Sequence, residues 1–267
     1  MIKGQDFRML PCKLRGIEAT VADSAITFGR HTHEQFGLGL MTRGGHRSAS
    51  GRGTVEAGPG DVITVNPGEV HDGAPIGPKG RSWFMLYLDP AIVAEAAGDI
   101  AEKTCRHSEF VSPVVQDRRV AFAVHHLFNA ATGAAQCPLQ LDEALLSALG
   151  PLLQSIPHRL TGIPTAIYKA RSMMDEDPAS AVSLAVLAQE AGLSRYQFLR
   201  AFARQTGLTP HTYLVQRRLR LARQLIRRGM APAEVAVTCG FADQSHLTRL
   251  FVRTYGLTPG TYARAMR

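Results

Sequence analysis

The pattern of hydrophobic and polar residues changes character along the chain. Between residues 17 and 89, short apolar runs alternate with glycine-rich segments, and the clearest runs are Phe36–Met41, Val62–Val65 and Trp83–Leu88. Short apolar runs separated by turns are typical of the strands of a small barrel or sandwich. Beyond residue 89, apolar residues recur at helical spacing, which predicts that helices follow the barrel.

The helices that follow the barrel are expected between residues 91 and 156. Their apolar stripes are Val120, Val124, Leu127 and Phe128 in one helix and Leu141, Leu145, Leu149 and Leu152 in another. Each stripe can pack against the barrel or against a second copy of the chain, and the sequence does not separate these alternatives. Two prolines interrupt the helical pattern in Pro157–Pro164, which predicts a linker.

The last third of the chain contains an internal repeat. Residues 187–193 align with residues 235–241, and Gly207–Pro210 aligns with Gly256–Pro259 after a shift of one residue at the turn. Such a pattern is typical of two copies of one helical motif. Each copy predicts a short helix, a turn with a glycine, and a second helix capped by Ser194 or Asp243. This arrangement is a helix-turn-helix.

One helix of about 28 Å, from Pro210 to Arg228, is expected to connect the two copies. It can hold the two second helices about one DNA turn apart, ~34 Å, so that both enter the major groove. Placing both helices in a straight duplex is difficult, which favours bending of the DNA. Its apolar stripe is Val215, Leu219, Ala222 and Ile226, and its polar face contains Arg217, Arg220, Gln224 and Arg227.

The second helices of both copies carry side chains suited to DNA. The exposed candidates are Arg195, Tyr196, Arg200 and Arg204 in the first copy and Gln244, Ser245, His246, Thr248 and Arg249 in the second. Arginine can pair with guanine, and glutamine with adenine, through two hydrogen bonds. Base readout and phosphate contact are both open for Arg200 and Arg249, whereas phosphate contact is favoured for Arg195 and Arg204.

Charge is distributed unevenly between the two parts of the chain. Among the 267 residues, 45% are hydrophobic and 19% are charged, which suffices for two folded domains. The net charge is +8, but residues 1–164 carry 15 basic and 16 acidic side chains, and residues 165–267 carry 15 and 6. All of the excess therefore lies in the last third, which favours a neutral module joined to a module that binds a polyanion.

Neither a membrane span nor a disulfide framework is indicated. No run of about 18 apolar residues is present, and the first residues lack the apolar core of a signal peptide. We therefore expect a cytoplasmic protein with no membrane partner. The four cysteines, at positions 12, 105, 137 and 239, form no C-x-x-C pair, so ordinary reduced thiols are expected. This spacing also excludes a DNA-repair methyl acceptor, which needs a metal-bound cysteine cluster.

Residues 165–267 resemble the DNA-binding domain of AraC/XylS family regulators. The motif that carries the resemblance is Ala236-Val-Thr-Cys-Gly-Phe-Ala-Asp-Gln-Ser-His-Leu-Thr-Arg-Leu-Phe251, followed by Tyr255-Gly-Leu-Thr-Pro259. The resemblance implies a seven-helix domain that regulates transcription, often by activation, with RNA polymerase as a partner. It also implies that the residues facing the groove are Tyr196, Arg200, Gln244, Ser245, His246 and Arg249. Leu199 stands where many members have a polar residue, which leaves readout by the first copy open.

The N-terminal half resembles the cupin-like sensory domain often attached to such regulators. The matching segments are His31-Thr-His33-Glu34, Phe36–Met41, Gly58-Pro-Gly-Asp61 and Asn66-Pro-Gly-Glu-Val-His71. Alternation along an extended chain places His31 and His33 on one face, and a cupin-like barrel would bring His71 near them. Trp83, Met85 and Tyr87 also alternate along one strand, and this side of the strand can line an effector pocket or pack as ordinary core. The candidate effector-binding residues are His31, His33, His71, Trp83 and Tyr87.

The histidines allow two interpretations. Three imidazoles in a barrel can bind Zn or Fe with open positions left for a substrate. We favour hydrogen bonding to the barrel mouth or to a polar ligand without metal, because a catalytic cupin usually adds a carboxylate and a further histidine, and only Glu34 is near. No catalytic residues and no cofactor are therefore assigned. His46, after two glycines, is expected in a turn. Arg43, Arg47 and Arg81 are open candidates for contact with an anionic effector, and nothing in the sequence assigns them.

The predicted architecture is an α+β multidomain protein. Residues 1–90 form a cupin-like effector-binding barrel, 91–156 a helical dimerisation or packing segment, 157–164 a linker, and 165–267 an all-α double helix-turn-helix domain. The predicted function is a homodimeric transcriptional regulator, with activation favoured, that binds double-stranded promoter DNA under the control of a small-molecule effector. The alternative is a metal-dependent cupin enzyme fused to a nucleic-acid-binding domain.

Overall fold

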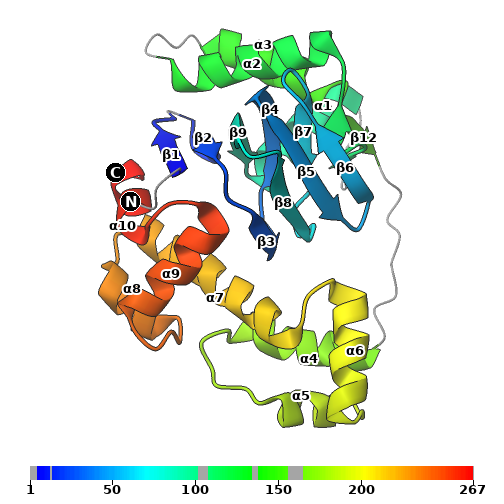
Figure 1. The fold of residues 1–267 in the computed structure, drawn as a ribbon, viewed down its shortest axis with the longest axis vertical. Helices are drawn as coiled ribbons and strands as arrows, with labels where there is room; N and C mark the ends of the chain where they lie inside the picture. Colours follow the sequence, from blue (N-terminus) through cyan, green and yellow to red (C-terminus); the bar gives the residue numbers. More distant parts are fainter. Residues whose placement is uncertain (1–4, 13, 102–107, 134–137, 156–164, 267) are drawn as a thin grey trace. The chain divides into compact units, whose positions relative to one another are not determined.

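The computed structural model of the chain describes residues 5–12, 14–101, 108–133, 138–155 and 165–266 (Figure 1). The chain forms two compact units, Met1–Arg159 and Leu160–Arg267, which we call unit 1 and unit 2. The expected linker and the cysteines at positions 105 and 137 lie outside the described residues. No helix in the described ranges is both long and apolar enough to cross a membrane.

Unit 1 is built around two antiparallel sheets. The six-stranded sheet has the order β1-β2-β9-β4-β7-β11, the four-stranded sheet has the order β3-β8-β5-β6, and β10 pairs with β12. The strands are β1 (Gln5–Leu10), β2 (Ile17–Ser24), β3 (Phe28–His31), β4 (Phe36–Arg43), β5 (Gly45–Ser50), β6 (Gly53–Ala57), β7 (Val62–Val65), β8 (His71–Ile76), β9 (Arg81–Leu88), β10 (Ser108–Phe110), β11 (Val114–Val115) and β12 (Leu153–Ser155). The described strands thus form a cupin-like arrangement of two sheets rather than one closed ladder.

The outer face of the six-stranded sheet is covered by helices. These are α1 (Pro90–Ala101), α2 (Arg118–Thr132) and α3 (Pro138–Leu149). The apolar stripe of α2 is buried in the same core as Phe84 and Leu86 of β9, and the Phe84 and Phe128 ring centroids are 4.1 Å apart. Of the two alternatives that the sequence left open, the α2 stripe therefore packs on the sheet.

The other face of β9 points between the two sheets. Arg81, Trp83, Met85 and Tyr87 occupy alternate positions on this face, as period-two geometry requires. Gly39 lies opposite Met85 in the register of β4 and β9, and a Cβ at Gly39 would overlap Met85 Sδ and the carbonyl of the preceding residue. Glycine at this position therefore lets Met85 pack flat against β4.

Unit 2 contains seven helices in its described residues. They are α4 (Thr165–Glu176), α5 (Leu184–Glu190), α6 (Arg195–Thr206), α7 (Pro210–Arg227), α8 (Pro232–Thr238), α9 (Gln244–Tyr255) and α10 (Pro259–Ala265). Helix α7 contacts members of both halves, with α4 and α6 on one side and α8, α9 and α10 on the other (Figure 1). The buried face of α7 includes Leu219, Ala222 and Ile226, as predicted, whereas Leu214 is more deeply buried than Val215.

The two helix-turn-helix copies repeat each other in backbone detail. At the two turns, Leu193 N donates to Ala188 O and Phe241 N donates to Ala236 O, both at 2.9 Å. The second helix of each copy then ends at a left-handed glycine, with φ 75° at position 207 and 77° at position 256. Each of these glycines precedes a threonine cap and a proline that starts the next helix. The sequence repeat is thus a structural repeat.

Candidate functional site

Helix α6 is fixed at its start and along its inner face. In a capping box, Ser194 Oγ accepts a hydrogen bond from Gln197 N at 3.3 Å, and Gln197 Oε1 accepts one from Ser194 N at 3.0 Å. Phe198 and Phe202 are fully buried and hold the helix against its neighbours. The predicted DNA contacts of this helix are all exposed, and they are Arg195, Tyr196, Arg200 and Arg204.

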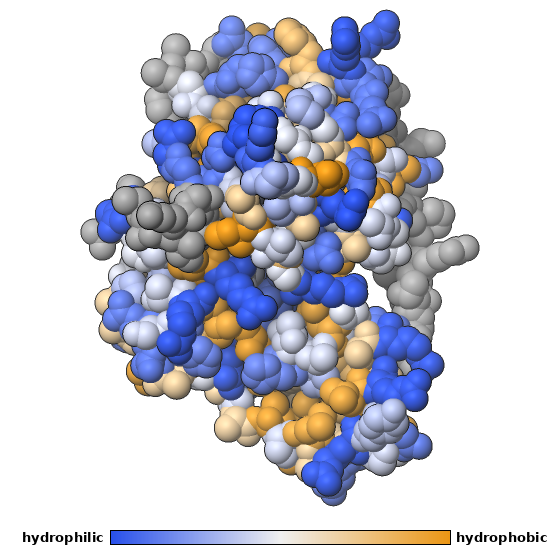
Figure 2. All heavy atoms as spheres, in the orientation of Figure 1, coloured by the Kyte–Doolittle hydropathy of each residue, from blue (hydrophilic) through white to orange (hydrophobic). Residues whose placement is uncertain are grey.

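The surface around α6 also contains apolar side chains. Leu199, which stands where many family members have a polar residue, is 36% exposed, and Leu184 and Val186 of α5 are exposed as well. Figure 2 shows hydrophobic and hydrophilic residues interspersed over this end of unit 2. The Arg200 guanidinium lies 5.7 Å from the centre of the Tyr196 ring. The face of α6 therefore presents charge and an aromatic ring together.

Helix α9, like α6, starts at a side-chain cap and is held by buried apolar residues, but its exposed side chains differ. Asp243 Oδ1 caps it by accepting a hydrogen bond from His246 N at 2.6 Å, and Leu247 and Phe251 are fully buried. Of the predicted contacts, Gln244, Ser245 and Arg249 are exposed, whereas His246 and Thr248 are half-buried. The His246 ring faces the turn, because its Nδ1 lies 3.4 Å from Ala242 N.

Several arginines of α7 are used inside unit 2. Arg217, predicted on a polar face, lies with Nε 2.8 Å from Asp175 Oδ1. Arg218 donates to the carbonyls of Pro178 and Gly240 at 2.8 and 2.7 Å. The Arg223 guanidinium lies 4.9 Å from the Tyr255 ring centroid. These three side chains stabilise the fold, so only part of the positive charge of the last third faces a ligand.

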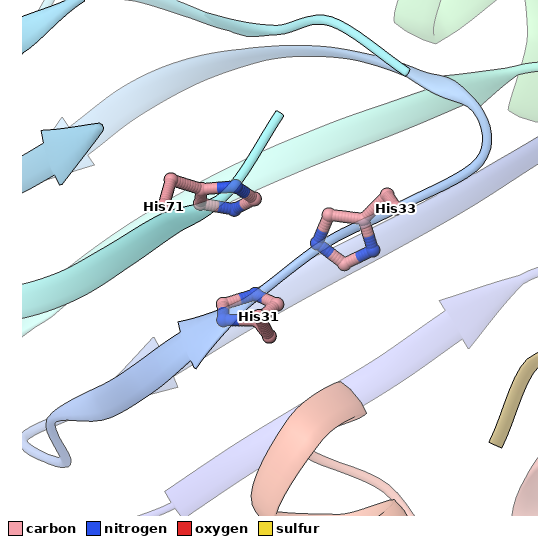
Figure 3. A group of neighbouring side chains, drawn as sticks. All are labelled: His31, His33 and His71. Carbon is pink, nitrogen blue, oxygen red and sulfur yellow. The ribbon is translucent and has the colours of Figure 1, made fainter. Parts of the chain in front are cut away.

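A second group of predicted residues meets between the sheets of unit 1. His31 of β3 and His71 of β8 are register partners, and His33 follows two residues after His31. The three rings point toward one another (Figure 3), and one potential ligand atom from each lies within 4.8 Å of the others. The predicted convergence of His31, His33 and His71 is therefore present. The His33 ring centroid also lies 5.1 Å from that of Tyr87.

The backbone defines which nitrogens of this histidine cluster face inward. His31 Nδ1 lies 2.7 Å from Gly29 O, and His71 Nδ1 lies 3.0 Å from Glu69 O. Because a carbonyl only accepts, Nδ1 carries the proton in both rings and Nε2 holds a lone pair. Burial lowers the pKa of both rings, and the neighbouring His71 contributes to lowering the pKa of His31 to about 3. Both imidazoles are therefore neutral at pH 7.

The histidine cluster has the donor chemistry of a transition-metal site. Neutral imidazole nitrogens bind Zn²⁺ at about 2.0–2.1 Å, and three such ligands leave a position for a further group. Nitrogens that already lie within 4.8 Å of one another need only small ring rotations to reach a common ion. The three histidines thus fit a divalent metal as well as a polar ligand.

Trp83 belongs to an aromatic group at the other end of the same face. Its ring packs edge-to-face with those of Phe7 and Phe28, at centroid distances of 5.6 and 6.5 Å. Trp83 and Tyr87 share one face of β9, but Tyr87 lies beside His33 and Trp83 lies among phenylalanines. The predicted effector residues therefore form two groups, a polar one of the three histidines with Tyr87 and an aromatic one around Trp83.

The sequence reasoning left two residues of this interior unassigned. Arg81 is fully buried at the start of β9, and His46 lies in β5, opposite Pro75 of β8, rather than in a turn. Strand β4 ends at Arg43 and β5 begins at Gly45, so Gly44 alone forms the bend between them, with φ 70°. The only signal was that Arg81 alternates with Trp83, Met85 and Tyr87. Alternation defines a face but does not show that the face is buried.

The described cysteines have the character that the sequence predicted. Burial is the main cause that raises the pKa of Cys12 and of Cys239 to about 11. Both side chains are therefore protonated thiols at pH 7, which disfavours a nucleophilic or metal-binding role.

Two family descriptions match the chain. Residues 12–149 match the AraC-like ligand binding domain, and residues 187–265 match a helix-turn-helix domain. The first match alone covers just over half of the chain and contains the elements of unit 1 from β2 to α3. The second contains the second helix of each copy of the repeat, α6 and α9.

Curated relatives and solved structures agree with these matches. YbfI of Bacillus subtilis, an uncharacterized HTH-type transcriptional regulator, is 27% identical over 225 residues, which are 82% of this chain and 81% of YbfI. The transcriptional activator RclR of Escherichia coli is 37% identical over 95 residues, which are 35% of this chain and 34% of RclR. ToxT of Vibrio cholerae has the same fold, with a TM-score of 0.56, 11% identity, and coverage of 99% of this chain and 100% of ToxT.

The ligand-binding description covers the histidine cluster, and the helix-turn-helix description covers the two repeated motifs. The chain therefore belongs to the AraC/XylS family of transcriptional regulators, in which a ligand-binding domain precedes a DNA-binding domain.

Proposed function

We propose that unit 2 reads promoter DNA by placing α6 and α9 in the major groove of one duplex. The observation that carries this proposal is the repeat itself. Both helices start at a side-chain cap, end at a left-handed glycine and keep polar faces exposed, with α7 between them. The 18 residues of α7 span about 27 Å, which approaches the ~34 Å turn of B-DNA and favours a bend in the duplex.

The exposed side chains suggest separate roles in this interface. Arg200 and Arg249 have the position and chemistry to pair with guanine, and Gln244 with adenine. Arg195, in the first turn of α6, and Arg204, in its last turn, are suited to phosphates on either side of the groove. The remaining proposed contacts are Tyr196, Ser245, His246 and Thr248.

A matched pair of variants tests this proposal. Arg249→Ala removes a charge from the exposed face of α9, and Arg264→Ala removes the same charge from α10. If Arg249 reads a base, its loss should relax specificity at one position and weaken specific binding by about 1–3 kcal/mol. The measurement is the affinity of each variant for a selected duplex and for a random duplex over a range of salt concentrations. It distinguishes a base contact, which affects the selected duplex, from a phosphate contact, which affects both. A uniform loss on both duplexes would make Arg249 a phosphate contact, and equal affinity of the wild type for both would reject the proposed function.

Unit 1 is proposed to bind the small-molecule effector between its two sheets. The proposed pocket is lined by His31, His33, His71, Trp83 and Tyr87. Support comes from the convergence of the three histidines, from the position of Tyr87 beside His33, and from the match of this unit to a ligand-binding domain. An effector can change DNA affinity only through a difference in its own affinity for two arrangements of the protein.

The geometry of the histidine cluster also favours a metal role. We propose that His31, His33 and His71 can hold a divalent transition metal, with a coordination position left for the effector. Cobalt titration of chelator-treated, tag-free protein should give a saturable absorption spectrum at one ion per chain. His33→Ala should lose it, and His126→Ala, on the exposed surface of α2, should keep it. No saturable binding would reject this site and the metal-enzyme alternative with it.

The chain is further proposed to act as a homodimer that activates transcription by contacting RNA polymerase. Phe122 of α2 is 72% exposed and Leu139 of α3 is 64% exposed, which leaves apolar side chains available to a second copy. RclR and RhaS, which match part of this chain, are named activators. Light scattering of Phe122→Glu should show a monomer, and an unchanged dimer would place the interface elsewhere.

The proposed division of labour follows the predicted boundaries. Residues 1–90 bind the effector, 91–156 pack on the barrel and join protomers, 157–164 link the units, and 165–267 bind DNA. The relatives of this chain are transcriptional regulators, which supports the proposal that the protein is cytoplasmic and not an enzyme.

A further inference from the structure

Arg81 is a buried cation that has no counter-ion in the part of the chain that the structure describes. Its side chain is 0% exposed, and it is the largest fully buried side chain among the described residues. The guanidinium lies 4.9 Å from the Trp83 ring centroid and 5.9 Å from that of Phe28. Nη1 makes one long hydrogen bond, 3.4 Å, to Ile26 O, while Nε and Nη2 have no hydrogen-bond partner. A charge in this position is unfavourable unless an anion or further acceptors compensate it.

The guanidinium nevertheless stays charged at neutral pH. Burial lowers the pKa of Arg81 only to about 10, and no carboxylate contributes to that pKa. None of the ion pairs found in the described ranges involves Arg81. The faces of two aromatic rings offset part of the lost hydration, but they provide no acceptor for the two unpaired N–H groups.

A third buried nitrogen without a hydrogen-bond partner among the described residues belongs to His46 of β5. His46 Nδ1 is buried without a hydrogen-bond partner, and burial is the main cause that lowers the pKa of His46 to about 3, with Arg81 as the next cause. Gly73 of β8 separates the two side chains. A Cβ at Gly73 would lie 2.9 Å from His46 Cε1 and 3.4 Å from Arg81 Nη2. Glycine thus lets the His46 ring and the Nη2 end of the Arg81 guanidinium approach the same point of β8.

The unpaired atoms have the geometry of carboxylate recognition. Nε–H and Nη2–H form one edge of the planar guanidinium, and this edge donates two parallel hydrogen bonds to the two oxygens of a carboxylate. The neutral His46 ring can donate a further hydrogen bond from Nδ1. Phe7, Phe28 and Trp83, packed edge-to-face nearby, offer an apolar surface for the rest of such a molecule.

We propose that Arg81 and His46 form the anion subsite of the effector pocket and that the effector is a small monocarboxylate with an aromatic or aliphatic body. This inference rests on the proposed function of unit 1 and names the class of its ligand. The bond to Ile26 O is the only hydrogen bond that the guanidinium makes among the described residues, and a carboxylate would replace or supplement it. Ile26, which provides this acceptor, lies in the segment between β2 and β3.

The test uses full-length, chelator-treated protein, so that metal binding does not contribute. Trp83 is the only tryptophan and lies against Arg81, so its fluorescence reports both binding and the unfolding of unit 1. Benzoate, octanoate and acetate are the probes, and benzamide is the uncharged control. We expect saturable fluorescence changes and a raised unfolding temperature with at least one carboxylate and none with benzamide. No saturable response to any of the three carboxylates would overturn the proposal.

Variants of Arg81 separate a ligand-binding role from a structural one. Arg81→Met removes the uncompensated charge, so ligand-free protein should unfold at the wild-type temperature or above it, with the carboxylate response lost. Arg81→Lys keeps the charge without the planar edge and should bind about tenfold more weakly. The control Arg47→Met, at an exposed residue paired with Glu56, should respond as the wild type does. A lower unfolding temperature for ligand-free Arg81→Met, or an unchanged carboxylate response, would make Arg81 structural.

A DNA-binding measurement on the same proteins keeps the two proposals distinct. Arg81→Met should retain the affinity of ligand-free wild type for promoter DNA and lose only its change with carboxylate. If wild type binds carboxylate but does not distinguish promoter from random DNA, the proposed function fails and the subsite stands.

Discussion

Arg218 joins the connector helix to the segments on both of its sides, and its removal gives the sharpest test of how unit 2 is held together. Its guanidinium donates to Pro178 O at 2.8 Å, to Gly240 O at 2.7 Å and to Ser180 O at 3.2 Å. The first and third carbonyls lie between α4 and α5, and the second lies at the turn before α9. Arg218→Ala removes all three bonds at once.

The expected loss can be worked from these contacts. A hydrogen bond from a charged donor contributes about 1.5–3 kcal/mol, so the two short bonds set a ceiling of about 3–6 kcal/mol. Arg218 is half-buried and water can reach some of the released carbonyls, so we expect a loss of about 2–4 kcal/mol. Arg218→Lys should restore only part of the lost stability, because an ammonium group is too compact to reach both Pro178 O and Gly240 O.

Two optical signals make the effect specific to unit 2. Most helical residues belong to α4–α10, whereas Trp83 lies in unit 1. In urea, Arg218→Ala should lower the midpoint of the helical circular dichroism transition by about 1–3 M and leave that of the Trp83 fluorescence transition unchanged. Arg253→Ala, exposed in the last turn of α9, is the control. If Arg218→Ala and Arg253→Ala shift the helical transition equally, the carbonyl bonds contribute nothing measurable and the reasoning is wrong.

Three further predictions concern single contacts. An alanine in the left-handed conformation costs about 1–2 kcal/mol. Gly240→Ala should destabilise unit 2 by more than this, because its Cβ would lie 2.6 Å from a carbonyl oxygen. Gly192→Ala has the same backbone conformation, but its Cβ meets open space, so it should cost only the backbone penalty. Urea midpoints of the two variants compare them directly, and equal midpoints would contradict the clash. Burial and the hydrogen bond to Asp175 raise the pKa of Tyr213 from 10.0 to about 12, so its contribution to stability is complete below pH 10 and is lost as the pH rises toward 12. Tyr213→Phe should be less stable at pH 8 and lack this loss, and a parallel alkaline decline in both proteins would refute the assignment. Asn66→Ala should destabilise unit 1 by about 2–3 kcal/mol, because its side chain exchanges two hydrogen bonds with the backbone of Phe110, and the Trp83 transition should report it while the helical transition of unit 2 stays in place.

The sequence by itself determined unit 2 almost completely. Its information is local: a cap at Ser194 or Asp243, a glycine at each turn, and apolar residues at helical spacing specify each helix within about one turn of chain. The repeat then showed that the motif occurs twice. What the local pattern did not reveal was the use of Arg217, Arg218 and Arg223 inside the fold, because their partners lie in other helices.

In unit 1 the sequence determined the histidines but not their surroundings. Alternation placed His31 and His33 together, and a barrel was enough to bring His71 to them. Arg81 and His46 lie 35 positions apart, and only the order of strands, with β9 central in one sheet and β5 beside β8 in the other, places both around Gly73. A strand's own residues define its two faces by period two, but which face loses its water depends on strands distant in sequence. Tertiary structure alone therefore decided that Arg81 is a buried, unpaired cation.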